Sequence, residues 1–211
     1  MKKLVLFCFA VLLQTTAMAQ STGALSEVES QKVMASLTEA AASMRTMQCR
    51  FVQEKTMSML AEPSVSEGKM FFASPDHLRW EYTTPYPFAL VVNGERIVKV
   101  TDGKTEVLDG KSGRMYQGIV NIVLGSASGQ KLFDTSVFDV ALFDDGKFWK
   151  AEMTPKRRDM KRMFSLLVFH FDKKTQAIDH VEFVEPKGDK TTIRFEDIRL
   201  NETMDDSIFK Q

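Results

Sequence analysis

The sequence predicts a mainly β protein with one N-terminal helix, in which about a dozen strands form a strongly curved antiparallel meander or a partly closed barrel. From Gln48 onward, short runs of β-favouring residues alternate with turn signals, and no helical crossovers of the kind that link parallel strands separate them. The turn signals include N-G at residues 93–94 and D-G at residues 102–103 and 109–110, which suit tight hairpins with positive φ.

The β-favouring runs define each expected strand. A sheet of so many sequential strands curls or closes on itself rather than staying flat. We expect strands near residues 48–59, 67–73, 77–83, 87–93, 96–101, 104–109, 113–116, 137–143, 147–154, 163–171, 177–185 and 190–199.

One amphipathic helix should precede the strands, over residues 27–44. Residues 26–29 (S-E-V-E) form a capping box, which satisfies the first free amides of a helix. After it, apolar residues recur at helical spacing. These residues are Val33, Met34, Leu37, Ala40, Ala41 and Met44.

A second apolar segment, residues 119–124, lies between Gly118 and Gly125. Its length and composition suit a buried strand, a short core helix or a movable lid over a cavity, and the pattern alone favours the core helix.

Residues 1–19 have the features of a secretory signal peptide: lysines at positions 2 and 3, an apolar centre over residues 4–13, and A-M-A before Gln20. Cys8 lies within the apolar centre rather than after a small residue at the cleavage point, so we expect no lipid attachment. Residues 20–211 should form a single exported domain.

Charge and cysteine content exclude several classes of protein. Removing Lys2 and Lys3 from the 28 basic residues leaves 26 against 28 acidic ones, a net charge near −2, so no overall positive field attracts nucleic acid. Cys49 is the one cysteine beyond the signal peptide; we expect a small buried hydrophobe there rather than a nucleophile.

The sequence contains no recognisable catalytic constellation. His77, His170 and His180 stand apart in the sequence without H-E-x-x-H or a cysteine pair, which predicts no metal site. G-K-T at residues 103–105 and G-K-S at residues 110–112 lack the earlier glycine of a phosphate-binding loop. We therefore expect no enzyme activity, cofactor or metal, and a hydrolase on a β scaffold is the weakest of the functional alternatives.

Residues 67–87 should form a hairpin around the turn S-P-D at residues 74–76. If Ala73 pairs with Leu78, Phe71 faces Trp80, and one face of the hairpin carries four large apolar side chains. These are Phe71, Leu78, Trp80 and Tyr82. Such a face suits either a filled core or the wall of an open cavity.

Methionine and phenylalanine are abundant: eleven of the 13 methionines and fourteen of the 16 phenylalanines lie beyond the signal peptide. These side chains suit an adaptable apolar cavity, but they would equally fill the interior of a curved sheet.

The basic run over residues 156–162 places five cations in seven positions between two expected strands. A solvated loop and a docking patch for an acidic partner are both compatible with it. The residues named for docking are Arg157, Arg158, Lys161 and Arg162.

Several of these motifs, in this order and spacing, resemble the LolA family of lipoprotein carriers. They are F-V-Q at residues 51–53, E-G-K at 67–69, P-D-H-L-R-W-E-Y at 75–82, N-G at 93–94 and T-P-K at 154–156. The resemblance spans nearly the whole expected domain. It implies an incomplete antiparallel barrel with a helical lid over a hydrophobic cavity that holds acyl chains.

The resemblance also implies a function and partners. By this resemblance, the chain would be a monomeric periplasmic carrier of acylated lipoproteins. It would take them from an inner-membrane lipoprotein-releasing ABC transporter towards the outer membrane, where the acceptor is unknown. The alternative is a lipid- or lipoprotein-binding sensor of the same fold. The acyl cavity would be lined by Phe51, Met57, Phe71, Leu78, Trp80, Tyr82, Phe88 and Leu90, together with Ile119, Ile122, Val123 and Leu124 of the lid segment. The lid helix would contribute Val33, Leu37 and Met44.

One position departs from the family pattern. Relatives often place an arginine immediately before the proline of the hairpin turn, where it holds the lid shut, and this chain has Ser74 there. Arg79 falls on the opposite face from Trp80 and does not replace it. We expect lid closure in this chain to depend on packing.

Overall fold

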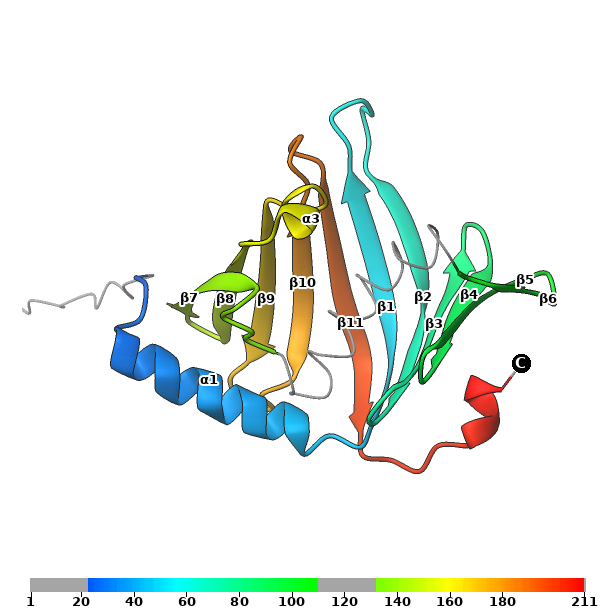
Figure 1. Ribbon diagram of the computed structural model, residues 1–211, viewed down its shortest axis with the longest axis horizontal. Coiled ribbons are helices and arrows are strands. Elements are labelled where there is room, and N and C mark those ends of the chain that lie inside the picture. The colour runs from blue at the N-terminus through cyan, green and yellow to red at the C-terminus, as the bar shows by residue number, and fades with distance from the viewer. Residues whose placement is uncertain (1–22, 110–131, 211) are drawn as a thin grey trace, which may run out of the picture.

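The computed structural model describes residues 23–109 and 132–210. Within them, eleven antiparallel strands form one sheet in the order β6-β5-β4-β3-β2-β1-β11-β10-β9-β8-β7 (Figure 1). The strands are β1 (Thr46–Thr56), β2 (Ser64–Ala73), β3 (His77–Thr84), β4 (Phe88–Asn93), β5 (Arg96–Thr101), β6 (Lys104–Val107), β7 (Phe138–Asp145), β8 (Phe148–Pro155), β9 (Leu166–Asp172), β10 (Ile178–Val184) and β11 (Lys190–Leu200). The helices are α1 (Glu27–Ala42), α3 (Arg158–Lys161) and the 3₁₀ turn η1 (Asp206–Phe209).

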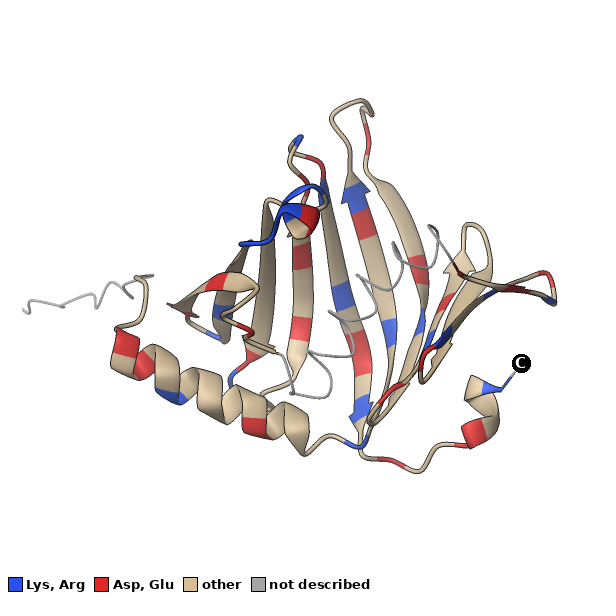
Figure 2. Ribbon diagram, in the orientation of Figure 1, with Lys and Arg blue, Asp and Glu red and all other residues tan. Residues whose placement is uncertain are grey.

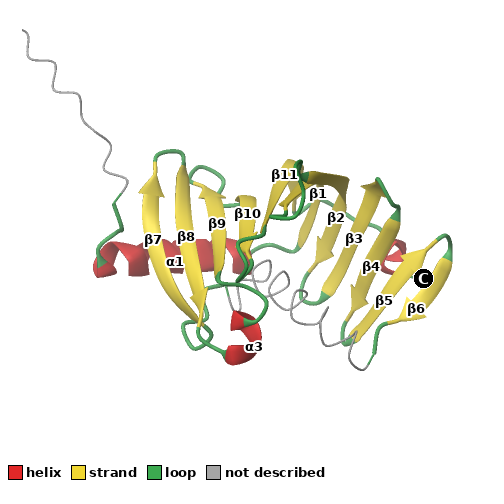
Figure 3. Ribbon diagram, turned by 90° about the horizontal axis from the view of Figure 1, so that it is seen from above, coloured by secondary structure: helices red, strands yellow, loops and turns green. Residues whose placement is uncertain are grey.

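The sheet consists of two meanders, β1 to β6 and β7 to β11, joined where β1 pairs with β11. Seen from above, the strands follow a curve, and β6 and β7 remain at opposite ends of the sheet (Figure 3). The predicted mainly β, incomplete antiparallel barrel is therefore confirmed. The strand predicted at residues 113–116 and the apolar segment at 119–124 lie outside the described residues.

Helix α1 begins at the predicted capping box. The Ser26 hydroxyl accepts a hydrogen bond from the Glu29 amide, and the Glu29 side chain accepts one from the Ser26 amide. The helix ends at Ala42, slightly before the predicted end at Met44. In the view of Figure 1 it crosses the lower ends of β7 to β10.

Two contacts fix α1 to the sheet. The Leu25 amide donates to the carbonyl of Leu142 on β7 at 2.8 Å, and Gln176, before β10, donates from Nε2 to the Ser36 hydroxyl at 2.7 Å. Leu37 is buried and belongs to the main core. Among the described residues no helix is both long enough and apolar enough to cross a membrane.

The hairpin at residues 67–87 forms, but its predicted register is wrong by one residue. Ala73 pairs with His77 rather than Leu78, so Leu78 faces Phe72 and Trp80 faces Met70. Only residues 74–76, the predicted S-P-D turn, connect the two strands, whereas pairing of Ala73 with Leu78 would have left four residues between them. Because side chains alternate between the faces of a strand, a shift by one residue moves Phe71 to the face opposite Trp80.

Gly68 on β2 pairs with Phe51 on β1 and lies against the Phe51 ring. A Cβ added to Gly68 would lie 2.5 Å from Cζ of Phe51 and would clash with the carbonyl oxygen of Glu81. A backbone oxygen cannot move aside as the end of a flexible side chain can. Glycine is therefore required here by space, which lets the Phe51 ring lie against the strand.

We expect Gly68→Ala to lower the free energy of unfolding by about 2–3 kcal/mol, because the methyl group overpacks this contact. Urea unfolding followed by circular dichroism measures the change. Lys69→Ala, at the exposed neighbouring position, is the matched control and should change stability by less than about 0.5 kcal/mol. Equal stability of Gly68→Ala and the control would contradict this account of the hairpin.

Candidate ligand cavity

The inner face of the sheet encloses an apolar cavity of about 500 Å³. Its walls come from both meanders, with β3 and β4 on one side and β9 to β11 on the other. Leu37 on α1 and Met44, which follows the helix, also line it. The two meanders together thus form one binding-sized space.

Most of the predicted lining residues that lie in the described part of the chain do face this cavity. Leu78, Trp80 and Tyr82 on β3 line it together with Phe88 and Leu90 on β4. The strand alternation that places them there was visible in the sequence. Whether they bind a ligand remains a prediction.

Phe51 lies behind this wall rather than on its surface. It is 1% exposed, and its ring centroid is 4.6 Å from that of Trp80 and 5.2 Å from that of Tyr82. Tyr82 in turn stacks on Phe88 at 4.6 Å. This aromatic cluster fixes the positions of the cavity-lining rings.

Three other predicted site residues in the described part of the chain, Phe71, Met57 and Val33, do not line the cavity. Phe71 points to the opposite face of the sheet because of the register shift, and Met70 takes its place in the wall. Met57 follows β1 and is not among the lining residues, whereas Val33 packs against the core without lining the cavity. The four lid residues Ile119, Ile122, Val123 and Leu124 lie outside the described residues.

The sequence interpretation missed the wall contributed by the second meander. Its residues are Phe164, Phe169, Phe171, Ile178, Val181, Phe183, Ile193 and Phe195. The signal was present as alternating large apolar residues on three consecutive expected strands, but nothing local shows which face of a strand looks inward.

A β-bulge on β10 sets this inward face. Ile178 pairs with Phe171, whereas His180 pairs with His170, so Asp179 is an extra residue on β10. Without the extra residue, Ile178 and His180 would share a face. With it, Ile178 points into the cavity and His180 points outward.

Polar groups gather at the end of the cavity formed by the ends of β1 and β10. Lys55 Nζ lies 3.0 Å from Glu185 Oε1, and both residues line the cavity. The Tyr82 hydroxyl donates to Gln53 Oε1 at 2.9 Å. The cavity therefore has an apolar body and a polar margin.

Cys49, the one cysteine in the described part of the chain, belongs to the core and is not among the cavity-lining residues. Cys49 is buried, and its burial raises the pKa of the thiol to about 12, which keeps it protonated and inert. The predicted role of Cys49 as a small core residue agrees with this environment.

The prediction that the histidines stand apart is wrong for two of them. His170 on β9 and His180 on β10 are paired in register, and their ring centroids are 3.8 Å apart on the face away from the cavity. Burial lowers the pKa of His170, and the charge of His180 lowers it further. Sequence separation concealed this pair because only the sheet register brings it together.

The basic run forms α3 and its flanks, above β9 and β10 in the view of Figure 2. Arg157 pairs with Asp159 at 2.7 Å, and Lys156 pairs with Asp139 at 3.0 Å. Phe164, which follows the run, lines the cavity. The cations thus lie next to one margin of the cavity.

The predicted departure at Ser74 lies in the exposed turn between β2 and β3. Its amide donates to the carbonyl of Arg45 at 2.7 Å. The lid segment that a side chain here would hold lies outside the described residues, so packing-dependent closure stays a prediction.

Together, the curved open sheet and the enclosed space define a class of protein: an open antiparallel β-sheet with an internal apolar cavity. The family model described as outer membrane lipoprotein carrier protein LolA matches residues 42–211. The chain therefore belongs to the LolA family, as the sequence motifs predicted.

Individual relatives are distant. An outer-membrane lipoprotein carrier protein of Methylibium petroleiphilum is 27% identical over 154 residues, which are 73% of this chain and 72% of that protein. One of Methylococcus capsulatus is 25% identical over 169 residues, or 80% of this chain and 77% of that protein. The crystal structure of MucB has a TM-score of 0.54 at 14% identity and covers 88% of this chain and 64% of MucB, a similarity of fold alone.

Proposed function

We propose that this chain is a non-enzymatic periplasmic carrier that holds the acyl chains of lipoproteins in its cavity and moves them from the inner towards the outer membrane. The apolar cavity enclosed by both meanders is the observation that carries this proposal. The relatives that are described as outer-membrane lipoprotein carriers support it. The donor would be an inner-membrane lipoprotein-releasing transporter.

The size and chemistry of the cavity suit an acyl chain. Ligand pockets generally enclose about 300–1,000 Å³, and this one lies within that range. Each buried methylene contributes about 0.8 kcal/mol, so a dozen methylenes give a gross gain of about 10 kcal/mol before ordering costs. That gain is sufficient to keep an acyl chain out of water.

An acylated ligand also carries carbonyl groups, and the wall offers a donor for one of them. Trp80 lines the cavity, and its buried indole N–H has no acceptor among the described residues. An ester or amide carbonyl at this position would satisfy it, which would favour an acylated ligand over a plain hydrocarbon.

Release requires that the bound state be only moderately favourable. Phenylalanine and methionine in the wall can repack around chains of different shape, and opening α1 or the predicted lid would offset part of the burial energy. A carrier gains directionality from the difference in affinity between donor and acceptor rather than from its own tightest binding.

We expect Leu78→Glu and Trp80→Glu to lower the affinity for a fluorescent acylated peptide at least tenfold, because each places a carboxylate in the apolar wall. Leu90→Glu tests the same wall at a less buried position if the first two variants fold poorly. Thr83→Glu, exposed on β3, is the matched control and should bind as the wild type does. Unchanged binding by folded wall variants would contradict the proposed site.

We further propose that Arg158, Lys161 and Arg162 contact an acidic surface of the transporter or of the membrane during transfer. Arg158→Glu combined with Lys161→Glu should slow transfer of acylated peptide to or from anionic vesicles or the transporter several-fold while leaving peptide affinity unchanged. Lys104→Glu combined with Lys69→Glu, both exposed and on the far meander, controls for net charge. Transfer rates equal to those of the control would remove this role.

A further inference from the structure

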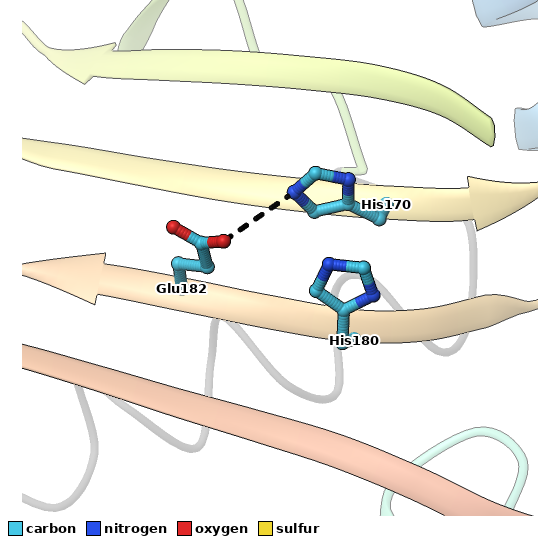
Figure 4. A group of neighbouring side chains, drawn as sticks. All are labelled: His170, His180 and Glu182. Atoms are coloured by element: carbon cyan, nitrogen blue, oxygen red, sulfur yellow. Dashed lines mark ion pairs between the residues drawn. The ribbon is translucent and has the colours of Figure 1, made fainter. Parts of the chain in front are cut away.

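Two buried histidines and a glutamate meet on the outer face of the sheet, away from the cavity. His170 on β9 faces His180 on β10 in register, and Glu182 follows on the same face of β10 (Figure 4). The histidines are 7% and 8% exposed, and the three side chains each offer a ligand atom within 4.8 Å of the others. Phe148 on β8 covers both imidazoles edge to face.

His170 has no hydrogen-bond partner for either ring nitrogen among the described residues. Its Nε2 is 3.7 Å from Oε1 of Glu182, too far for a hydrogen bond. Leaving such a buried polar group unpaired is destabilising and uncommon in folded proteins, so it requires a cause. A ligand of the imidazole nitrogen would supply one.

His180 is already oriented by its neighbour. Its Nδ1 lies 2.8 Å from Oδ2 of Asp179, the bulge residue of β10. This contact directs the other nitrogen, Nε2, towards the space beside His170 and Glu182 (Figure 4). A carboxylate that accepts from one nitrogen of a histidine while the other nitrogen binds metal is the usual arrangement at metal sites.

Glu182 is held in a comparable way. Its Oε2 lies 2.7 Å from Nζ of Lys190 on β11, which leaves Oε1 facing His170. Two other lysines near the cluster have carboxylate partners of their own: Lys150 pairs with Glu152 at 3.0 Å, and Lys147 lies 3.8 Å from Asp179. These pairings offset the positive charge that would otherwise oppose a cation.

From these observations we infer that His170, His180 and Glu182 form a binding site for a divalent transition-metal ion such as Zn²⁺. Two imidazoles and one carboxylate are typical ligands of Zn²⁺, with a fourth position left for water. The site lies on the face of the sheet opposite the cavity, and its inference does not rest on the proposed carrier function. Its metal would cross-link β9 and β10 directly behind the wall residues Phe169 and Val181.

Metal binding requires a small closing movement. Ligand nitrogens and oxygens around tetrahedral Zn²⁺ are about 3.4 Å apart, so atoms now up to 4.8 Å apart must approach, and the stacked rings must tilt until their lone pairs converge. His170 breaks no hydrogen bond in tilting. Glu182 keeps Lys190 on its other oxygen.

The test uses the full exported chain without an affinity tag, treated with chelator and then titrated with Zn²⁺ by calorimetry and with Co²⁺ by visible absorption. We expect one ion per chain, the intense Co²⁺ bands of a four-coordinate site, and a Tm raised by roughly 5–10 °C at a hundredfold excess of Zn²⁺ over Kd. Absence of a one-to-one ion at 1 mM Zn²⁺ would overturn the assignment.

Variants locate the site. His170→Phe keeps an aromatic ring against Phe148, and Glu182→Gln keeps the length of the side chain; each should weaken Zn²⁺ binding at least tenfold. His77→Gln, which alters the third histidine on β3, should bind as the wild type does. Equal affinity in all three variants, or loss of binding in His77→Gln alone, would refute the site.

A readout on the unaltered chain covers the case in which His170→Phe does not fold. Nitrogen-15 NMR of the imidazoles should show Zn²⁺ shifting Nε2 of both His170 and His180, and unshifted resonances at saturating Zn²⁺ would also refute the site.

Discussion

The pairing of β1 with β11 is the contact on which the rest of the structure depends. Each meander could form from neighbouring segments alone, but neither would enclose a space. The pairing joins residues far apart in the sequence, for example Phe51 with Phe195 and Gln53 with Ile193. Closing such a long loop costs entropy that local hairpins do not. The pairing produces a continuous curved sheet in which the inner side chains of the two meanders face one another.

Because β1 pairs with β11, the continuous sheet has an inner and an outer face that differ in chemistry. Strand alternation gives the inner face Trp80, Leu90 and Phe171, which bound the apolar cavity. The outer face carries salt bridges and, between β9 and β10, the buried histidine pair. One bulge residue, Asp179, separates these environments, since it sends Ile178 inward and His180 outward. The proposed carrier site and the proposed metal site thus depend on the same irregularity.

Much of the fold could be predicted because its signals are local. Capping of α1 by Ser26, the hairpin turns, and the alternation that brings Leu78, Trp80 and Tyr82 to one face all act within a few residues. The register of β2 against β3 was not predicted correctly. If the turn after Ala73 had one more residue, Phe71 rather than Met70 would lie in the cavity wall. The composition of the hairpin favours neither register.

Contacts between residues on different strands of the second meander also could not be predicted from local sequence patterns. The wall from β9 to β11 and the contact between His170 and His180 exist only once strands are aligned across the sheet. Since a bulge shifts that alignment by one residue, a histidine ten positions from another can lie far away or in ring contact. Motif spacing could not distinguish these cases.

The molecules that co-purify with the chain test most directly whether its cavity holds acyl chains. The protein would be purified without detergent and analysed by native mass spectrometry, with Leu90→Glu purified in parallel. The account predicts acyl-modified species bound to the wild type and depleted in the variant. Only non-acylated molecules on the wild type, or the same acylated species retained equally by the variant, would contradict it.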